Sequence, residues 1–291
     1  MLEAMPWESM VTLLEPKYAG RNKWWRAKTD LFLMLKIYCL QQRFNLSDPW
    51  VEEEIYDRVT FQRFLDIDLL NDNIPDETTI LNFRHFLEKY QFQNQLFELI
   101  NDYLEKKWMI MRKWTLVDAT IITASGSTKN QAGKRDQEMR STKKWGNYYH
   151  WMKVHIWVDG DTWVVHTVTH TSANRHDSTQ TDELLHWEEK YVSWDKAYGS
   201  KARKQQAREM GIVYGMLDKA PRWNKLSNKQ EKRNKKRQRV KAKVEHPFQV
   251  VKHLRWHRKV RYRWLMKNWL QFTMLMWLAN IYKMRKKILV V

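Results

Sequence analysis

The sequence predicts an α/β chain in which an all-helical N-terminal domain precedes a domain built on a mixed sheet. From about residue 28 to 107, apolar residues recur every three or four positions, as on the buried side of helices. From about residue 110, short runs of β-branched and aromatic residues are separated by turn residues, which is typical of strands. We therefore predict two domains, residues 1–110 and residues 111–291.

The helical region carries clear start signals. Ser47-Asp48-Pro49 precedes one periodic run, and Pro75-Asp76-Glu77 precedes another, so that each run begins with a capping side chain next to a proline. Short helices joined by tight turns are the material of a helix-turn-helix motif, whose second helix enters the DNA major groove. They are also the material of a plain helical bundle, and the pattern alone leaves both structures open.

The second domain is expected to begin with consecutive antiparallel strands and to continue with alternating strands and helices. The polar stretch 125–145 is interpreted as a long loop, either in contact with DNA or simply solvated. The closing stretch 270–291 is expected to be a core-packing helix. The predicted strands are 114–122, 154–158, 163–169, 191–195 and 212–217, with a turn at 159–162 and a helix at 178–190.

The charge balance points to a polyanionic partner. The 291 residues include 52 Lys and Arg against 33 Asp and Glu, a formal net charge of +19. Nucleic acid is favoured over a membrane, because no apolar run reaches the roughly 18 residues of a spanning helix. The sequence has only one cysteine, Cys39, so a disulfide framework is excluded. Cys39 lies in an apolar stretch, where a buried thiol is the usual case. We expect a reducing compartment, most simply the cytoplasm.

Three acids stand in contexts where an uncompensated charge is costly. Asp118 and Asp195 each end an apolar run of strand type, and Glu245 lies among cations on a predicted helix. Buried carboxylates need partners, and where several converge a divalent cation is the commonest functional answer. Taken singly, an acid at the end of a strand, such as Asp118, is more typical of a turn or a cap. Their order and contexts together predict a metal site.

This order resembles the Asp-Asp-Glu constellation of DDE transposases, specifically the insertion-sequence-5 group, over nearly the whole chain. A Tyr three residues after Asp195 matches the family. So does Lys252, seven residues after Glu245, whereas Lys241 stands where the family usually has Arg. Lys is a point charge and cannot make the two-pronged phosphate contact of Arg. The resemblance implies an RNase H-like catalytic domain with the three acids at one edge of the sheet.

The resemblance also implies a function. We expect a DNA transposase that cuts at transposon inverted-repeat ends and joins them to target DNA, acting as a homodimer or a larger assembly. Asp118, Asp195 and Glu245 are expected to hold two Mg²⁺ ions, which Mn²⁺ can replace. The residues expected to contact DNA are Arg84 in the helical domain, Lys143 and Lys144 in the polar stretch, and Lys235, Lys236, Lys241 and Lys252 around Glu245.

Two other functions share these features. A metal-dependent nuclease of the same fold would use the same acids without strand joining. A decayed transposase would keep the positive charge, bind DNA and lose metal dependence, although the presence of all three acids argues against it. A strand-joining assay separates the first alternative from a transposase.

Tryptophan is in excess over glycine. The chain has 17 Trp and 8 Gly, whereas Gly ordinarily makes up about 7% of residues. At Trp163, which closes the predicted turn 159–162, we expect a left-handed backbone that strains any residue other than Gly. We interpret the excess as glycine codons, most simply UGA, rendered as Trp. The positions where the family usually has Gly are Trp50, Trp108, Trp114, Trp151, Trp157, Trp163, Trp187, Trp194, Trp256 and Trp264.

Overall fold

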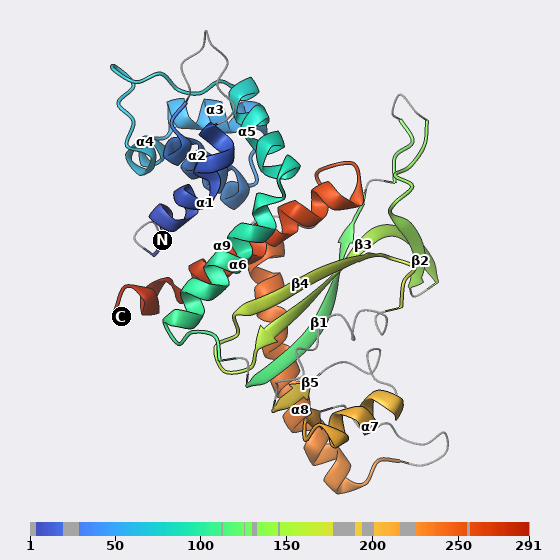
Figure 1. Cartoon of the computed structure of the whole chain (residues 1–291). Helices are drawn as coiled ribbons and strands as arrows, with labels where there is room; N and C mark the ends of the chain where they lie inside the picture. Colours follow the sequence, from blue (N-terminus) through green and yellow to red (C-terminus); the bar gives the residue numbers. More distant parts are fainter. Residues whose placement is uncertain are drawn as a thin grey trace. The chain divides into compact units, whose positions relative to one another are not determined.

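The chain forms two compact units in a computed structural model (Figure 1). The structure describes residues 4–19, 29–111, 113–124, 126–129, 133–144, 146–176, 190–193, 201–215, 225–254 and 257–290. The helical unit consists of Met1–Lys107, His253–His257 and Leu270–Val291. The sheet unit consists of Trp108–Lys252 and Arg258–Trp269. A helical N-terminal region is therefore followed by a mixed-sheet, RNase H-like domain, as the sequence predicts.

Short helices make up the N-terminal part of the helical unit. The predicted start signals are confirmed at two of them. The Ser47 hydroxyl accepts a hydrogen bond from the Trp50 N–H (3.3 Å), and the Asp76 carboxylate accepts one from the Thr79 N–H (2.7 Å). The helices are α1 (Trp7–Ala19), α2 (Leu31–Phe44), α3 (Asp48–Asp57), α4 (Val59–Leu65), α5 (Glu77–Lys89) and α6 (Phe92–Lys106).

The core of the helical unit is aromatic and includes the end of the chain. The ring of Phe86 packs edge-on against Tyr18 at a centroid distance of 5.4 Å. From residue 270 onward, helix α9 (Leu265–Ile288) belongs to this unit, and its Trp277 and Ile281 are fully buried. The predicted core-packing helix is therefore confirmed. Among the described residues, no helix combines the length and the apolar character needed to cross a bilayer.

The sheet of the second unit has the order β2-β3-β1-β5-β6, with β4 also paired to β3. Strands β1, β2, β3 and β4 pair antiparallel, whereas β5 and β6 extend the sheet from β1 in parallel. This is the predicted change from consecutive strands to strand–helix alternation. The strands are β1 (Trp114–Thr123), β2 (Arg140–Lys144), β3 (Asn147–Asp159), β4 (Val165–Ser172), β5 (Tyr191–Ser193) and β6 (Val213–Gly215).

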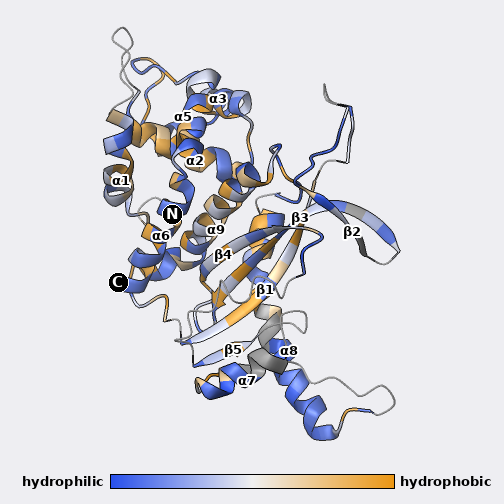
Figure 2. Cartoon of the chain, turned by 45° about the vertical axis from the view of Figure 1, so that its right-hand side comes forward, coloured by the Kyte–Doolittle hydropathy of each residue, from blue (hydrophilic) through white to orange (hydrophobic). Residues whose placement is uncertain are grey.

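Two helices of the sheet unit follow β5. Helix α7 (Lys201–Glu209) lies between β5 and β6, and helix α8 (Asn228–Gln249) packs against β1. A π-helical turn, Val250–Leu254, continues α8. Figure 2 shows that the N-terminal half of α8 is hydrophilic, whereas β1 and β3 carry long hydrophobic stretches. The helix predicted over 178–190 lies outside the described residues, except for its last residue.

The prediction of a loop throughout 125–145 is wrong at its C-terminal end. Residues Arg140–Lys144 form β2 and pair with the N-terminal half of β3. Just before it, Met139 is buried. Sequence reasoning missed this strand because its side chains are polar, although an edge strand needs only a partner for its backbone N–H and C=O groups.

The turn between β3 and β4 has the expected backbone. Trp163 has φ 64°, in the left-handed region, and its N–H donates to the Asp159 carbonyl (2.8 Å). The buried Asp159 carboxylate organises the same turn, because it accepts hydrogen bonds from the N–H groups of Asp161 (3.0 Å) and Thr162 (2.9 Å). The prediction of a left-handed residue that closes this hairpin is therefore confirmed.

Candidate active site and nucleic-acid surface

Asp118 lies in the central strand of the sheet, where β1 changes from buried to half-buried. Leu116 and Val117 are 1% and 2% exposed, whereas Asp118 and the residues up to Ile121 are half-buried. On one side, Asp118 pairs with Ile156 of β3. A carboxylate here is supported by the sheet and still accessible from one face, which is what a reacting group requires.

Strand β5, which leads to the second predicted acid, is the parallel neighbour of β1. Leu116 pairs with Ser193 in this ladder. Leu116 is two residues before Asp118, and Ser193 is two residues before Asp195. Asp195 itself lies outside the described residues.

Glu245 is exposed on α8, the helix that packs against β1. Its neighbours Val244 and Phe248, one turn apart, are buried and anchor the helix. Pro247 then removes one hydrogen bond from the helical ladder, and the N–H of Val250 donates to the carbonyls of both His246 and Pro247. The apolar side of α8 thus faces the unit's core and leaves the Glu245 carboxylate in solvent.

The carboxylates of Asp118 and Glu245 suit a hard divalent cation, because Mg²⁺ prefers oxygen ligands and is usually held by one or two carboxylates. No three His, Cys, Asp or Glu side chains converge as metal ligands within the described ranges, which do not include Asp195. The membership of Asp118, Asp195 and Glu245 in one site therefore stays a prediction.

The side chain of Lys252 is held by β1. Its ammonium donates to the Thr120 hydroxyl (2.5 Å) and to the Ile121 carbonyl (3.0 Å). Both acceptors lie within three residues of Asp118. Sequence reasoning assigned Lys252 to DNA and missed this contact, because no periodic pattern links residues so far apart in the chain.

The basic surface of α8 precedes Glu245. A capping box formed by Ser227 and Gln230 begins the helix, and Lys235 and Lys236 are exposed on it. Lys241 lies further along α8, and Lys143 and Lys144 lie in β2, but the side chains of these three are outside the described set. The structure thus presents Lys235 and Lys236 of α8 to solvent.

Arg84 has a different environment from the one expected. It is only 7% exposed, and its guanidinium lies 2.7 Å from the Asp48 carboxylate and 3.4 Å from that of Glu88. The contact with Asp48 joins α5 to α3 within the helical unit, whereas Glu88 lies one turn further along α5 itself. A DNA contact by Arg84 would require the pair with Asp48 to open.

Two carboxylates of the polar stretch also have structural partners. Asp136 accepts a hydrogen bond from the Trp264 N–H, and Glu138 accepts one from the Leu265 N–H, each at 2.6 Å. They satisfy N–H groups at the start of α9, where the helix dipole favours negative charge. Helix capping is therefore a third role of this stretch, in addition to the solvation and the DNA contact considered from its sequence.

His170 on β4 is half-buried against an aromatic ring. Its imidazole stacks on the indole of Trp269 with 4.6 Å between ring centroids and 20° between planes. Burial lowers the pKa of His170 from 6.5 to about 4, so the ring is neutral near pH 7. His170 is therefore a packing residue in this geometry.

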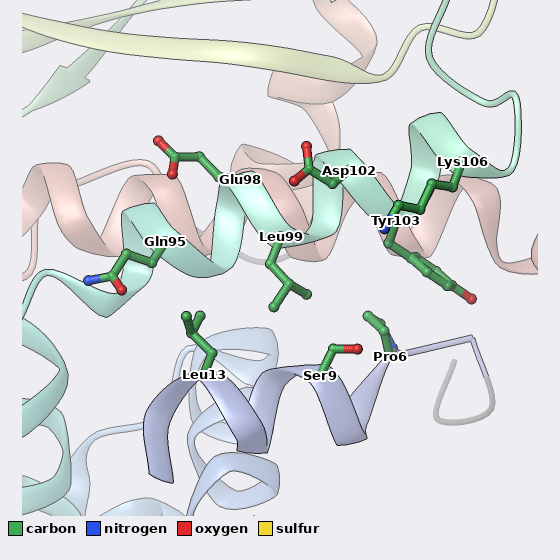
Figure 3. Close-up of a pocket in the computed structure, with 9 residues that line it drawn as sticks. All are labelled: Pro6, Ser9, Leu13, Gln95, Glu98, Leu99, Asp102, Tyr103 and Lys106. Atoms are coloured by element: carbon green, nitrogen blue, oxygen red, sulfur yellow. The ribbon is translucent and has the colours of Figure 1, made fainter. Parts of the chain in front are cut away.

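The helical unit contains a groove of about 490 Å³ between α1 and α6. Leu13 and Leu99 lie within it, whereas Glu98 and Asp102 point away from α1 (Figure 3). Partial burial raises the pKa of the Tyr103 hydroxyl at one end. The two acids of the lining thus point out of the space between the two helices rather than into it.

Comparison with known proteins identifies both parts of the chain. Residues 111–281 match the family described as "Transposase DDE domain", and residues 1–86 match "Transposase domain (DUF772)". One similar solved structure is described as "Crystal structure of the Mos1 Strand Transfer Complex", at 10% identity and a TM-score of 0.31, covering 97% of this chain and 84% of that one. Because the first match spans more than half of the sequence, this chain belongs to the DDE transposases, a family of phosphoryl-transfer enzymes that act on DNA and generally use divalent metals.

Proposed function

We propose that this chain is a transposase of the insertion-sequence-5 group that cuts DNA at the inverted-repeat ends of its element and joins the freed 3′ ends to target DNA. The observation that supports it is the pairing of Leu116 with Ser193, two residues before Asp118 and Asp195, on the strand against which the Glu245 helix packs. Adjacent parallel strands in that register lead both acids to the same end of the sheet.

The three carboxylates have one role in this proposal. Asp118, Asp195 and Glu245 hold two Mg²⁺ ions, for which Mn²⁺ can substitute. Bound there, the ions supply charge stabilisation for the attacking and departing oxygens of an in-line displacement at phosphorus. Asp118, at the half-buried part of β1, keeps its position because the ladder with β3 continues through the residues before and after it.

Two parts of the chain bind DNA in this proposal, the exposed lysines of α8 and the helical unit. The exposed lysines on α8 lie on the same helix as Glu245, so they track phosphates on the DNA next to the cut. The helical unit, with its capped short helices, recognises the end sequence. Two transposon ends must be joined in one event, so the active assembly contains at least two copies of the chain.

The test is an assay of purified protein with labelled inverted-repeat DNA and Mg²⁺. Asp118→Asn, Asp195→Asn and Glu245→Gln should each abolish cleavage and joining while end binding persists, because the substitutions keep shape and remove a metal-binding charge. Exposed Glu53→Gln on α3 is the matched control and should keep full activity. Full cleavage by Asp195→Asn would contradict the assignment of Asp195 to the metal site.

A nuclease of the same fold is the alternative function. It makes the same cuts and depends on the same acids. Cleavage products that never join to a target duplex, under conditions where a 3′-hydroxyl end is supplied ready-made, would establish the nuclease instead.

A further inference from the structure

The contact between Lys252 and β1 lies beyond the part of β1 that pairs with the described residues of β5. Within the described residues, β5 pairs with β1 only at Trp114–Leu116. At the far end of β1, Thr123 forms an isolated bridge with Lys259. The ammonium of Lys252 reaches β1 between these two pairings and satisfies the Ile121 carbonyl there. The Lys252 side chain thus ties the helical segment to the strand at this place.

The same two elements carry two of the proposed metal ligands. Asp118 is two residues before Thr120 on β1, and Glu245 is seven residues, about two helical turns, before Lys252. The turn that carries Lys252 is π-helical, a feature frequent at functional sites. We propose that Lys252 is a positioning residue, which sets the spacing between β1 and α8 and so the separation of Asp118 and Glu245. This inference rests on the proposed metal site.

Lys252→Met and Thr120→Val test it, since each keeps the approximate shape and removes one side of the hydrogen bond. We expect Lys252→Met to lower kcat about 10²-fold, the cost of misplacing reacting groups by about 1 Å. It should also raise the Mg²⁺ concentration for half-maximal cleavage, with Kd for DNA unchanged. Thr120→Val should shift both quantities in the same direction, and the double variant should be no worse than Lys252→Met alone.

The outcomes separate positioning from a phosphate contact. Lys252→Arg keeps the positive charge but replaces the compact ammonium with a planar fork, so activity stays low if Lys252 positions β1. Recovery of activity in Lys252→Arg, or a weaker Kd with a shallower salt dependence in Lys252→Met, overturns the proposal in favour of a phosphate contact. Full cleavage by Asp118→Asn would instead contradict the proposed metal site, and this result is distinct from the outcomes for the Lys252 variants.

A second inference rests on the backbone at three tryptophans. Trp108, Trp163 and Trp264 have φ 56°, 64° and 79°. Among the described non-glycine residues with positive φ, the others are Asn45, Asp66 and Gln91. Asn and Asp tolerate the left-handed region because their short side chains bond locally, whereas a bulky residue there is a genuine outlier.

Each of the three positions is one where local structure favours glycine. Trp108 follows Lys107, the C-cap of α6, and a left-handed residue directly after the C-cap is most often Gly. Trp163 closes the β3–β4 hairpin, and Trp264 directly precedes α9. The indoles of Trp108 and Trp264 bury little surface in return, since they are 81% and 45% exposed. Trp163 is half-buried, and its ring packs edge-on against Trp114.

We infer that positions 108, 163 and 264 are glycine positions and that the protein made in its source carries glycine there. The same three belong to the positions singled out by family resemblance, and the backbone evidence is independent of that resemblance. Codons that specify glycine in the source, most simply UGA, account for all three at once. The inference concerns these residues alone and does not depend on the catalytic proposal.

Gly and Ala variants at each position test the inference. Ala removes the indole but keeps Cβ, so only Gly relieves the left-handed strain. We expect Tm to rise by about 2–4 °C for each Gly variant and less for each Ala variant. Trp277→Gly is the matched control and should lower Tm, because Trp277 is fully buried inside α9. Equal Tm for Gly and Ala variants, or UGG codons at the three positions in the gene, overturns the inference.

Discussion

Arg84 and Asp48 form an ion pair at 2.7 Å between α5 and α3, and the Arg84 side chain is almost completely buried. The second oxygen of the Asp48 carboxylate accepts a hydrogen bond from the side-chain amide of Gln41 on α2 (2.7 Å). Three helices therefore meet at one carboxylate. Charged side chains that are buried together stabilise a fold only as a set, because removal of one leaves the other desolvated and uncompensated.

We therefore predict that Arg84→Ala lowers the free energy of unfolding by about 1.5–3 kcal/mol, the usual worth of a hydrogen bond to a charged group. Urea unfolding of the purified chain measures this loss. Exposed Arg63→Ala on α4 should change it by less than about 0.5 kcal/mol. If Arg84→Ala were as stable as the unaltered chain and relaxed the choice of DNA sequence instead, Arg84 would be a base-reading residue, as its position in the sequence suggested.

His170 makes stability depend on pH. Its pKa is lowered to about 4 when folded, against an ordinary value of 6.5, so the unfolded chain takes up the proton more readily. The contribution of neutral His170 to the free energy of unfolding is fully present above pH 6.5. It is lost as pH falls towards 4, and the total loss is at most about 3 kcal/mol. His170→Phe should flatten this part of the stability profile, whereas exposed His85→Asn should follow the unaltered chain. Identical profiles for His170→Phe and the unaltered chain contradict the prediction.

The exposed lysines of α8 should act on all DNA alike. We expect Lys235→Ala with Lys236→Ala to weaken specific and non-specific DNA about equally, and to make the slope of log K against log salt shallower by up to about 2. Lys286→Ala with Lys287→Ala removes the same charge from exposed positions on α9 and serves as the control. Filter binding at several salt concentrations measures both slopes. Equal effects of the two double variants would mean that net charge, rather than the α8 surface, governs binding.

The two acids that cap α9 should contribute to stability rather than to DNA binding. Asp136→Ala with Glu138→Ala leaves the Trp264 and Leu265 N–H groups without their carboxylates. Loss of an N-terminal cap costs about 0.5–2 kcal/mol, so thermal unfolding should begin at lower temperature while DNA affinity is retained. Tighter DNA binding with unchanged stability would instead indicate that these acids repel DNA phosphates.

The sequence by itself determined the elements whose residues carry a local signal. The apolar run to Asp118 predicted β1, the caps at Ser47 and Asp76 predicted α3 and α5, and the turn before Trp163 predicted a left-handed residue. These signals are local because periodicity, capping and turn chemistry depend on neighbours within a few residues. The order of the acids likewise needed only the sequence and its resemblance to a family.

Only the tertiary structure decided which polar side chains meet. Lys252 and Arg84 are both basic residues on helical segments. Lys252 donates to Thr120 and Ile121 of β1, which are 132 and 131 residues away in the sequence. Arg84 donates to Asp48, which is 36 residues away. Strand β2 likewise depends on its partner β3, because its sequence contains no apolar residue that would mark a buried face. Contacts between distant residues are set by how elements pack, so a charge that appears free in the sequence can be fully engaged in the fold.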